Sequence, residues 1–349
     1  MVPQRAAPPA GEAALTYALL PHGLAIWERD TRGLRFHWQN EPEQSHLKLA
    51  SQFVAHCASP SSPALALRSE GQELYAWLLG PVVADLAPGQ TLVVEPDGPL
   101  GQVPFAALVS ADGDYVAAHY AVEYAPLVGR DPGNVAPGAF SAHTPTLVVG
   151  SPVAAGLSAL PDAREEAQAV QARFPLATRL DGAAATLAAV RRALPHAELI
   201  HFAGHAGHAG PGGGGALLLA PVHAGEGPVP LTSAALAGLD LRRCRLVVLS
   251  ACATTPGDTG GLFEPRSLVR AFLLDGTRYV LANRWNVDSA SSRRLMDSFY
   301  AHLQQGASVP QALQAAQQQQ WHDAVGRRPY YWAAGAVLTR DLESKPKEG

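Results

Sequence analysis

Short apolar runs alternate with amphipathic stretches over the C-terminal two thirds of the chain. Three of the runs, TLVVGSP (146–152), LIHFAG (199–204) and RLVVLSA (245–251), are apolar at nearly every position. Strands that are buried on both faces of a parallel sheet show this continuous pattern. The segments AREEAQAVQARF and ATLAAVRRAL lie between the first two runs and have helical spacing and helix start signals. The pattern therefore predicts an α/β fold around a mostly parallel sheet.

The same alternation continues to the C-terminus. After the glycine-rich loop at 210–215, we expect a short strand in ALLLAP and a helix in LTSAALAGL. The later segments are predicted as a helix closed by Gly276, a strand, two long helices and a closing strand; they are RSLVRAFLLDG, TRYVLANRW, SASSRRLMDSFYAHLQQG, VPQALQAAQQQQW and YYWAAGAVLT. No internal repeat is visible, which argues against a solenoid.

The N-terminal quarter has a different pattern. Residues 1–14 are rich in Ala and Pro and are expected to form a flexible arm. Residues 15–90 are interpreted as a cover region with a small antiparallel sheet, followed by a short helix over about Gln72–Leu79 that Gly80 and Pro81 end. Residues 91–342 are interpreted as the main α/β core and residues 343–349 as a flexible tail.

Composition narrows the class of protein and of partner. The chain has 349 residues, of which 47% are hydrophobic and 16% charged, so it is long enough for a large core. A formal net charge of -4 gives no electrostatic reason to expect nucleic acid or an anionic membrane surface as a partner. Three cysteines are too few for a disulfide framework. With no signal-peptide pattern and no apolar run of membrane-spanning length, these features predict a cytoplasmic protein.

Two of the predicted strands end on a residue with catalytic chemistry. His205 follows the run at 199–204, and Cys252 follows the run at 245–251. Open α/β sheets build their sites beyond the carboxyl ends of their strands. The separation of 47 residues matches the roughly 50 residues between histidine and cysteine in caspase-type proteases. We therefore expect a thiolate nucleophile with an imidazole acid/base, and an oxyanion hole built from the backbone N–H groups of Ala206 and Cys252.

Two other interpretations of these residues remain open. Cys252 has the sequence context of a small buried hydrophobic residue at the end of a core strand, which is a common place for a free cysteine. Cys57 and Cys244 are interpreted as structural in the same way. The histidines His201, His205 and His208 also allow a zinc site. A strand places His201 about 13 Å from His205 at 3.3 Å per residue, which argues against that site.

The order of the motifs resembles the CHAT domain, a family of caspase-like and separase-like cysteine proteases of clan CD. The resemblance covers about residues 65–338. It rests on the Pro-Asp-Gly turn at 96–98 and the segment VPFAAL at 103–108. The motifs that follow along the chain are LVVGSP, LPDAREEAQAV, IHFAGH, VVLSACAT, SLVRAFLLDGTRYVLANRWNVD and PYYWAAGAVL. It implies a caspase-hemoglobinase αβα sandwich, preceded here by the small β-rich region. It also implies that His205 is the general acid/base and Cys252 the nucleophile of peptide-bond hydrolysis, without a metal or an organic cofactor.

The resemblance carries further expectations about substrate and partners. An acid that relatives often carry four residues after a tryptophan is replaced by Ser289, so Asp288, Asp258 and Glu264 are the candidate pocket acids, and Trp285 is a candidate pocket wall. A protein substrate is implied, together with an activating sensor protein or a separate repeat-containing subunit and a role in bacterial defence. The loops 210–215 and 254–265 are hypothesised to order on activation. The alternative is a catalytically silent scaffold that binds a partner protein.

Overall fold

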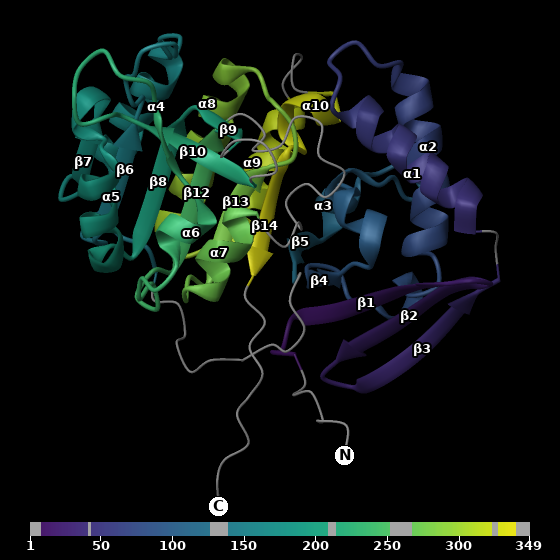
Figure 1. Cartoon of the computed structure of the whole chain (residues 1–349). Helices are drawn as coiled ribbons and strands as arrows, with labels where there is room; N and C mark the ends of the chain where they lie inside the picture. Colours follow the sequence, from purple (N-terminus) through teal and green to yellow (C-terminus); the bar gives the residue numbers. More distant parts are fainter. Residues whose placement is uncertain are drawn as a thin grey trace, which may run out of the picture.

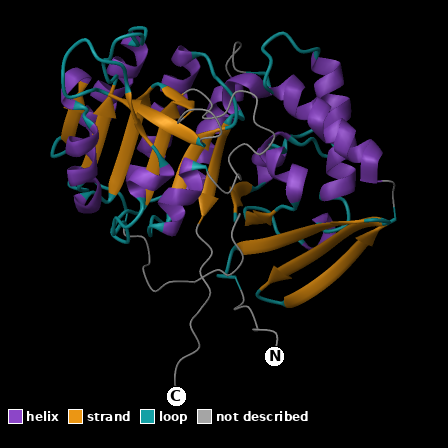
Figure 2. Ribbon diagram, viewed as in Figure 1, coloured by secondary structure: helices purple, strands orange, loops and turns teal. Residues whose placement is uncertain are grey.

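The computed structural model describes residues 8–40, 43–125, 139–208, 214–251, 267–322 and 327–339. Within these residues the fold is a mixed α/β sandwich around one large sheet (Figures 1 and 2). The eleven strands of the large sheet are, in spatial order, β3 (Gly33–Gln39), β2 (Gly23–Asp30), β1 (Glu12–Leu20), β4 (Thr91–Glu95), β5 (Ala121–Tyr124), β14 (Gly335–Thr339), β13 (Tyr279–Asn283), β12 (Leu246–Ala251), β8 (Leu199–Gly204), β6 (Thr146–Gly150) and β7 (Thr178–Asp181).

The large sheet consists of two blocks that meet at one antiparallel pair. Strands β13, β12, β8, β6 and β7 run parallel to one another. Strands β14, β5, β4 and β1 form a second parallel block, and β13 pairs with β14 in the antiparallel direction. The prediction of a mostly parallel sheet is therefore confirmed, and the antiparallel junction is an addition that the apolar runs alone do not specify.

Helices cover both faces of the first block. The α-helices of the described residues are α1 (Glu43–Cys57), α2 (Ala64–Leu78), α3 (Val116–His119), α4 (Pro161–Arg173), α5 (Leu187–Ala193), α6 (Ser233–Leu236), α7 (Leu268–Leu274), α8 (Ser289–Gln304), α9 (Val309–His322) and α10 (Pro329–Trp332). Residues of α4, α8 and α9 share one core cluster with Val148, Leu199 and Val248. Residues of α5, α6 and α7 share the other with Ile200 and Phe202. Alternate side chains of each strand thus enter opposite cores, which explains the continuous apolar runs.

The N-terminal region belongs to the same sheet. The expected small antiparallel sheet is the meander β1–β2–β3, but β1 also pairs with β4 in parallel, with Glu12 opposite Thr91. The strand therefore begins inside the segment that we expected to be a flexible arm. The short helix expected near Gln72 is the second half of α2, and α1 precedes it. The carbonyl of Tyr75 accepts a hydrogen bond from the N–H of Gly80, so the helix ends where expected.

A second, small sheet stands beyond the carboxyl ends of the central strands. It contains β9 (Ala206–His208), β10 (Gly215–Leu219) and β11 (Val229–Leu231), all antiparallel. Strand β9 starts two residues after β8 ends, so the chain passes from the large sheet to the small one through His205 (Figure 1). The fold therefore fixes the backbone on both sides of this histidine.

Candidate active site

The two predicted catalytic positions follow directly after neighbouring, paired strand ends. In the parallel pair β8 and β12, Gly204 lies opposite Ala251. His205 and Cys252 are the next residues along the chain. Hydrogen-bonded strands lie about 4.8 Å apart, so the ends of β8 and β12 lie side by side. Cys252 itself lies outside the described residues, as do Asp258 and Glu264.

The imidazole of His205 is oriented by a backbone carbonyl. Its Nε2 atom lies 2.8 Å from the carbonyl oxygen of Ser158. A carbonyl oxygen only accepts hydrogen bonds, so Nε2 must carry the proton. In the neutral ring, Nδ1 is then the atom with a free lone pair, and it is the atom that can take a proton from a thiol.

The segment that supplies this carbonyl is held against the strand ends. The N–H of Ser151 donates to the carbonyl of Ala203 at 2.7 Å, and Ser151 has a φ of 42°, a conformation that non-glycine residues rarely adopt. A Cβ on Gly204 would lie 2.9 Å from Cδ of Pro152, so the two segments approach closely at this glycine. A strained turn next to a strand end is typical of functional sites.

The backbone N–H of Ala206 points away from its neighbouring strand. The N–H of Leu218 donates to the carbonyl of His205 at 2.9 Å, and Ala206 lies opposite Leu217. In an antiparallel pair, residues alternate between hydrogen-bonded and non-hydrogen-bonded positions. Ala206 occupies the second kind, so its N–H is directed away from β10.

A cavity of about 220 Å³ opens beside the two strand ends. Gly204 and Ala251 line it, together with Asn283 at the end of β13, Val287 and Ser289. Its only charged lining residues among the described part of the chain are Asp162 and Glu166 in α4. A larger cavity of about 420 Å³ is lined by residues of the helices and the turn after α8, and no strand end contributes to it. The smaller cavity is therefore the one that the strand ends serve.

Two predicted pocket residues have structural contacts in the described chain. Asp288 is the N-cap of α8, and its carboxylate accepts a hydrogen bond from the N–H of Ser291 at 3.0 Å. Trp285 is buried, and its Nε1–H donates to the carbonyl of Tyr330 at 3.1 Å. Neither residue lines the 220 Å³ cavity, although Val287 and Ser289 on either side of Asp288 do.

Comparison with known proteins places this geometry in a family. The sequence profile described as the CHAT domain matches residues 48–341. The chain belongs to the CHAT domain family. This is a family of caspase-like cysteine peptidases, as the order of the motifs suggested. No curated protein matches the sequence.

A solved structure of separase supports the fold of this CHAT domain. A chain of the Saccharomyces cerevisiae separase–securin complex aligns with a TM-score of 0.55 and 11% identity, over 96% of this chain and 30% of that one. The Arg-specific cysteine proteinase gingipain R aligns with a TM-score of 0.42 and 12% identity, over 85% of this chain and 75% of that one. The CHAT chain thus has a caspase-like fold and spans about a third of the separase complex chain that it matches.

The buried histidine of the CHAT domain, His201, has partners other than a metal. Its Nδ1 lies 2.8 Å from the hydroxyl of Tyr300, and its Nε2 lies 3.3 Å from Oε1 of Glu166. Burial, with Glu166 nearby, raises the pKa of Tyr300 well above its usual value, so the phenol keeps its proton. The Nε2 atom of His201 and Oε1 of Glu166 make no hydrogen bond in the described chain, to each other or to another group. His201 is thus a fully buried core residue whose two ring nitrogens face Tyr300 and Glu166.

The other two cysteines lie in surroundings that disfavour the thiolate form. Cys57 and Cys244 are both buried. Burial raises the pKa of the Cys57 thiol well above its usual value and that of Cys244 to about 12. Because the thiolate is the reactive form, neither is suited to catalysis at neutral pH. Their interpretation as structural residues is confirmed.

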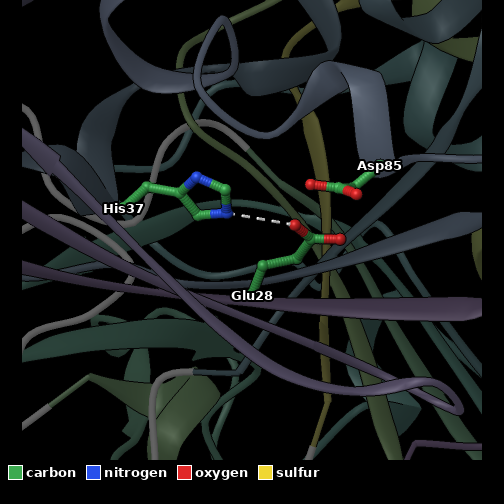
Figure 3. A group of neighbouring side chains, drawn as sticks. All are labelled: Glu28, His37 and Asp85. Carbon is green, nitrogen blue, oxygen red and sulfur yellow. Dashed lines mark hydrogen bonds and ion pairs between the residues drawn. The ribbon is translucent and has the colours of Figure 1, made fainter.

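One cluster in the described residues has the side chains of a metal site. Ligand atoms of Glu28, His37 and Asp85 lie within 4.8 Å of one another (Figure 3). The guanidinium of Arg35 already contacts these carboxylates, with its Nε 3.2 Å from Glu28 and 3.6 Å from Asp85. A divalent cation would have to displace this arginine, so the donor set fits an ion-pair network and does not fit a resident metal. No helix in the described ranges has the length and apolar character needed to cross a bilayer.

Sequence reasoning missed the two acidic residues of the cavity. Asp162 and Glu166 are four residues apart in α4, so they lie on one face of the helix. The segment AREEAQAVQARF was predicted to be a helix from its spacing and start signals, and the four-residue separation of Asp162 and Glu166 near its start was the signal available in the sequence. The fact that this face meets the ends of β8 and β12 depends on packing, which the spacing does not specify.

Proposed function

We propose that this chain is a cysteine endopeptidase with His205 as the general acid/base and Cys252 as the nucleophile. The observation that carries the proposal is the pairing of Gly204 with Ala251. His205 and Cys252 each follow one of these paired residues, at the ends of adjacent strands. The hydrogen bond from His205 to Ser158 supports the role of the imidazole, since it leaves Nδ1 available as a base.

In the proposed reaction, Nδ1 of His205 takes the proton of the Cys252 thiol, and the thiolate sulfur attacks the carbonyl carbon of the scissile peptide bond. The carbonyl oxygen becomes an oxyanion, for which the backbone N–H groups of Ala206 and Cys252 are the proposed donors. Collapse breaks the C–N bond, and the imidazolium returns the proton to the leaving amine. Water, deprotonated by the same imidazole, then hydrolyses the thioester and restores the thiol.

The 220 Å³ cavity is proposed as the pocket for the side chain that precedes the scissile bond. It adjoins both catalytic positions through Gly204 and Ala251. Among the described residues, the charged groups that line this cavity are the carboxyl groups of Asp162 and Glu166, and Glu166 is buried. A buried carboxylate favours a cationic ligand, so we propose a preference for arginine or lysine at this position.

Cleavage of a diverse peptide library tests the catalytic assignment. We expect cuts by the wild-type chain, read by mass spectrometry, and loss of those cuts in both Cys252→Ala and His205→Ala. Cuts that persist in either variant would reject the dyad. If the wild-type chain makes no cuts, a reactive peptide that labels Cys252 would indicate a latent enzyme, and the absence of labelling would favour the silent scaffold.

A matched pair of variants tests the pocket. Glu166→Gln and Asp162→Asn remove a carboxylate from the cavity, whereas Glu165→Gln removes one that is exposed and pairs with Arg293 outside it. For peptides with arginine before the cut, we expect kcat/KM to fall by about tenfold, on the order of 1.4 kcal/mol, in the cavity variants and to stay unchanged in Glu165→Gln. Equal effects in all three variants would contradict the assignment.

We also propose that an activating sensor protein or repeat-containing subunit controls the enzyme, within a bacterial defence response. Family membership supports this proposal, as does the glycine and proline content of 210–215 and 254–265, most of which lies outside the described residues. The isolated chain should then turn over peptides far more slowly than the value of about 10 per second that is typical of enzymes. Turnover near that value without a partner would reject control by a sensor.

A further inference from the structure

The outer edge of the large sheet carries a row of exposed apolar side chains. Strand β3 stands at this edge, and no strand in the described part of the chain pairs with its outer side (Figures 1 and 2). Leu34, Phe36 and Trp38 are 65%, 56% and 39% exposed, and they occupy alternate positions of the strand. Such a row at an open edge favours pairing with another strand.

The same three residues direct their backbone groups outward. Asp30 pairs with Gly33 across a two-residue turn, which makes this a hydrogen-bonded pair. Hydrogen-bonded and non-hydrogen-bonded pairs then alternate along the hairpin, so residues 33, 35, 37 and 39 bond to β2. The N–H and C=O groups of Leu34, Phe36 and Trp38 therefore point to the open edge.

The edge is complementary to itself. In an antiparallel pair of two β3 strands centred on Phe36, each Leu34 lies opposite the Trp38 of the other copy, and the two Phe36 residues face each other. All three residues direct backbone groups outward, so this register satisfies every one of them. A two-fold axis through the centre makes the contact isologous, which is the symmetry of most protein dimers.

The neighbouring side chains do not oppose this pairing. On the exposed face, the ring of Phe36 packs against that of Trp27 in a tilted arrangement, with ring centroids 5.5 Å apart. On the opposite face, His37 contacts Glu28 (Figure 3). Arg35 also contacts Glu28 and bonds to Asp30 at 2.9 Å. The positive charges that two copies would bring together are therefore already compensated within each chain.

We propose that the chain forms a two-fold dimer by antiparallel pairing of β3 with the β3 of a second copy, in register at Phe36. A second copy is the occupant because the edge requires an extended strand with outward backbone groups and apolar side chains at alternate positions. The chain itself presents this strand. Because the interface lies at the far edge of the sheet from β8 and β12, the proposal is independent of the peptidase activity.

Sedimentation and light scattering across a concentration series test the dimer. We expect a species of twice 36.6 kDa, the mass of one chain. Phe36→Lys should weaken association by about tenfold or more, because the dimer would place two lysines opposite each other. Leu65→Lys is the matched control, since Leu65 is 84% exposed on α2 and should leave association unchanged. A wild-type chain that stays monomeric overturns the proposal.

Cross-linking fixes the register even if Phe36→Lys folds poorly. In a Cys252→Ala background the remaining Cys57 and Cys244 are buried, so Phe36→Cys provides one accessible thiol in the described residues. Opposed residues in a hydrogen-bonded pair have Cα atoms about 5.5 Å apart, which permits a disulfide. We expect oxidation to yield a covalent dimer from Phe36→Cys and not from Leu65→Cys. Equal yields of covalent dimer from Phe36→Cys and Leu65→Cys would place the interface elsewhere. A dimer that Phe36→Lys leaves intact would do the same. A monomer that captures a different protein at β3 would also overturn the proposal.

Discussion

The two ends of the sheet differ in how their strands are covered. Near one end, β12 and β8 are covered by helices on both faces and finish at the candidate active site. At the other end, the meander β1–β2–β3 finishes in β3, whose positions alternate between exposed and half-buried and whose outer edge is open in the described part of the chain. A fully covered strand holds its end rigidly, which catalysis requires, whereas an open edge keeps backbone groups available for association.

The two ends also bury their carboxyl groups with different partners. Near the active site, Glu166 lies at ion-pair distance from the imidazole of His201, which in turn shares a hydrogen bond with Tyr300. In the meander, Glu28 and Asp30 share Arg35, which adds a permanent positive charge. The site end therefore holds a less compensated acid beside a cavity, and the meander holds a neutralised network that fixes β3 in place.

The largest effect is expected from removing the histidine at the site end. His201→Leu leaves the carboxyl group of Glu166 and the hydroxyl of Tyr300 buried without a partner, so we expect a loss of about 3–5 kcal/mol in the free energy of unfolding. Urea denaturation measures it. Tyr300→Phe, which removes only the hydroxyl, should lose about 1–2 kcal/mol. A His201→Leu variant as stable as wild type would show that the network does not stabilise this end.

A smaller effect is expected from the matching change in the meander. Arg35→Met removes the shared cation of Glu28 and Asp30, and because this arginine is partly exposed we expect a loss of about 2 kcal/mol. Peptidase activity per folded molecule should not change. Arg243→Met is the control. Arg243 is exposed and its ion pair with Glu198 is long, at 3.8 Å, so the free energy of unfolding should change by no more than about 0.5 kcal/mol. Loss of activity in Arg35→Met would contradict the separation of the two ends.

Acid should weaken the meander in a defined range of pH. Burial would raise the pKa of Asp30, but hydrogen bonds from Arg32 and Arg35 outweigh it and lower the pKa to about 2. A folded-state pKa below the unfolded value of about 3.9 means that this carboxylate stabilises the fold above that value, and the stabilisation is lost as the pH falls through about 2. Thermal unfolding at a series of pH values should show this slope in wild type and a shallower one in Asp30→Asn.

The smallest effect concerns a helix that covers the site end. The side chain of Thr186 accepts a hydrogen bond from the N–H of Ala189 and caps α5. Thr186→Ala should destabilise the protein by about 1 kcal/mol, and Thr186→Ser should restore most of the loss. The denaturation midpoints of the two variants and the wild-type chain measure the effect. Equal midpoints for all three would show that the Thr186 side chain does not stabilise α5.

Local sequence signals were sufficient for most of the site end. The run LIHFAG is apolar at five of its six positions because β8 enters a core on each side, and α5 lies within the segment ATLAAVRRAL, which was predicted to be a helix. The same logic identified His205 as a residue at a strand end. These features depend on interactions within a few residues, which local patterns encode.

Other features depend on contacts between distant segments. The carbonyl of Ser158 reaches His205 across 47 residues, and nothing about a serine in a loop marks its carbonyl as the partner. Glu166 borders the cavity because α4 packs on β6 and β8. The pairing of β1 with β4 begins at Glu12, in a segment whose Ala and Pro content indicated an arm. Such contacts arise from tertiary packing, which local patterns do not encode.

The most direct test of the account measures which cysteine reacts and whether His205 controls it. A peptide carrying an electrophile is incubated with the wild-type chain and with His205→Ala, and the labelled cysteine is located by mass spectrometry. We predict one label on Cys252, none on the buried Cys57 and Cys244, and labelling at least about tenfold slower in His205→Ala. Labelling at the same rate in both chains, or labelling of Cys57 or Cys244, would contradict the assignment of a His205–Cys252 dyad.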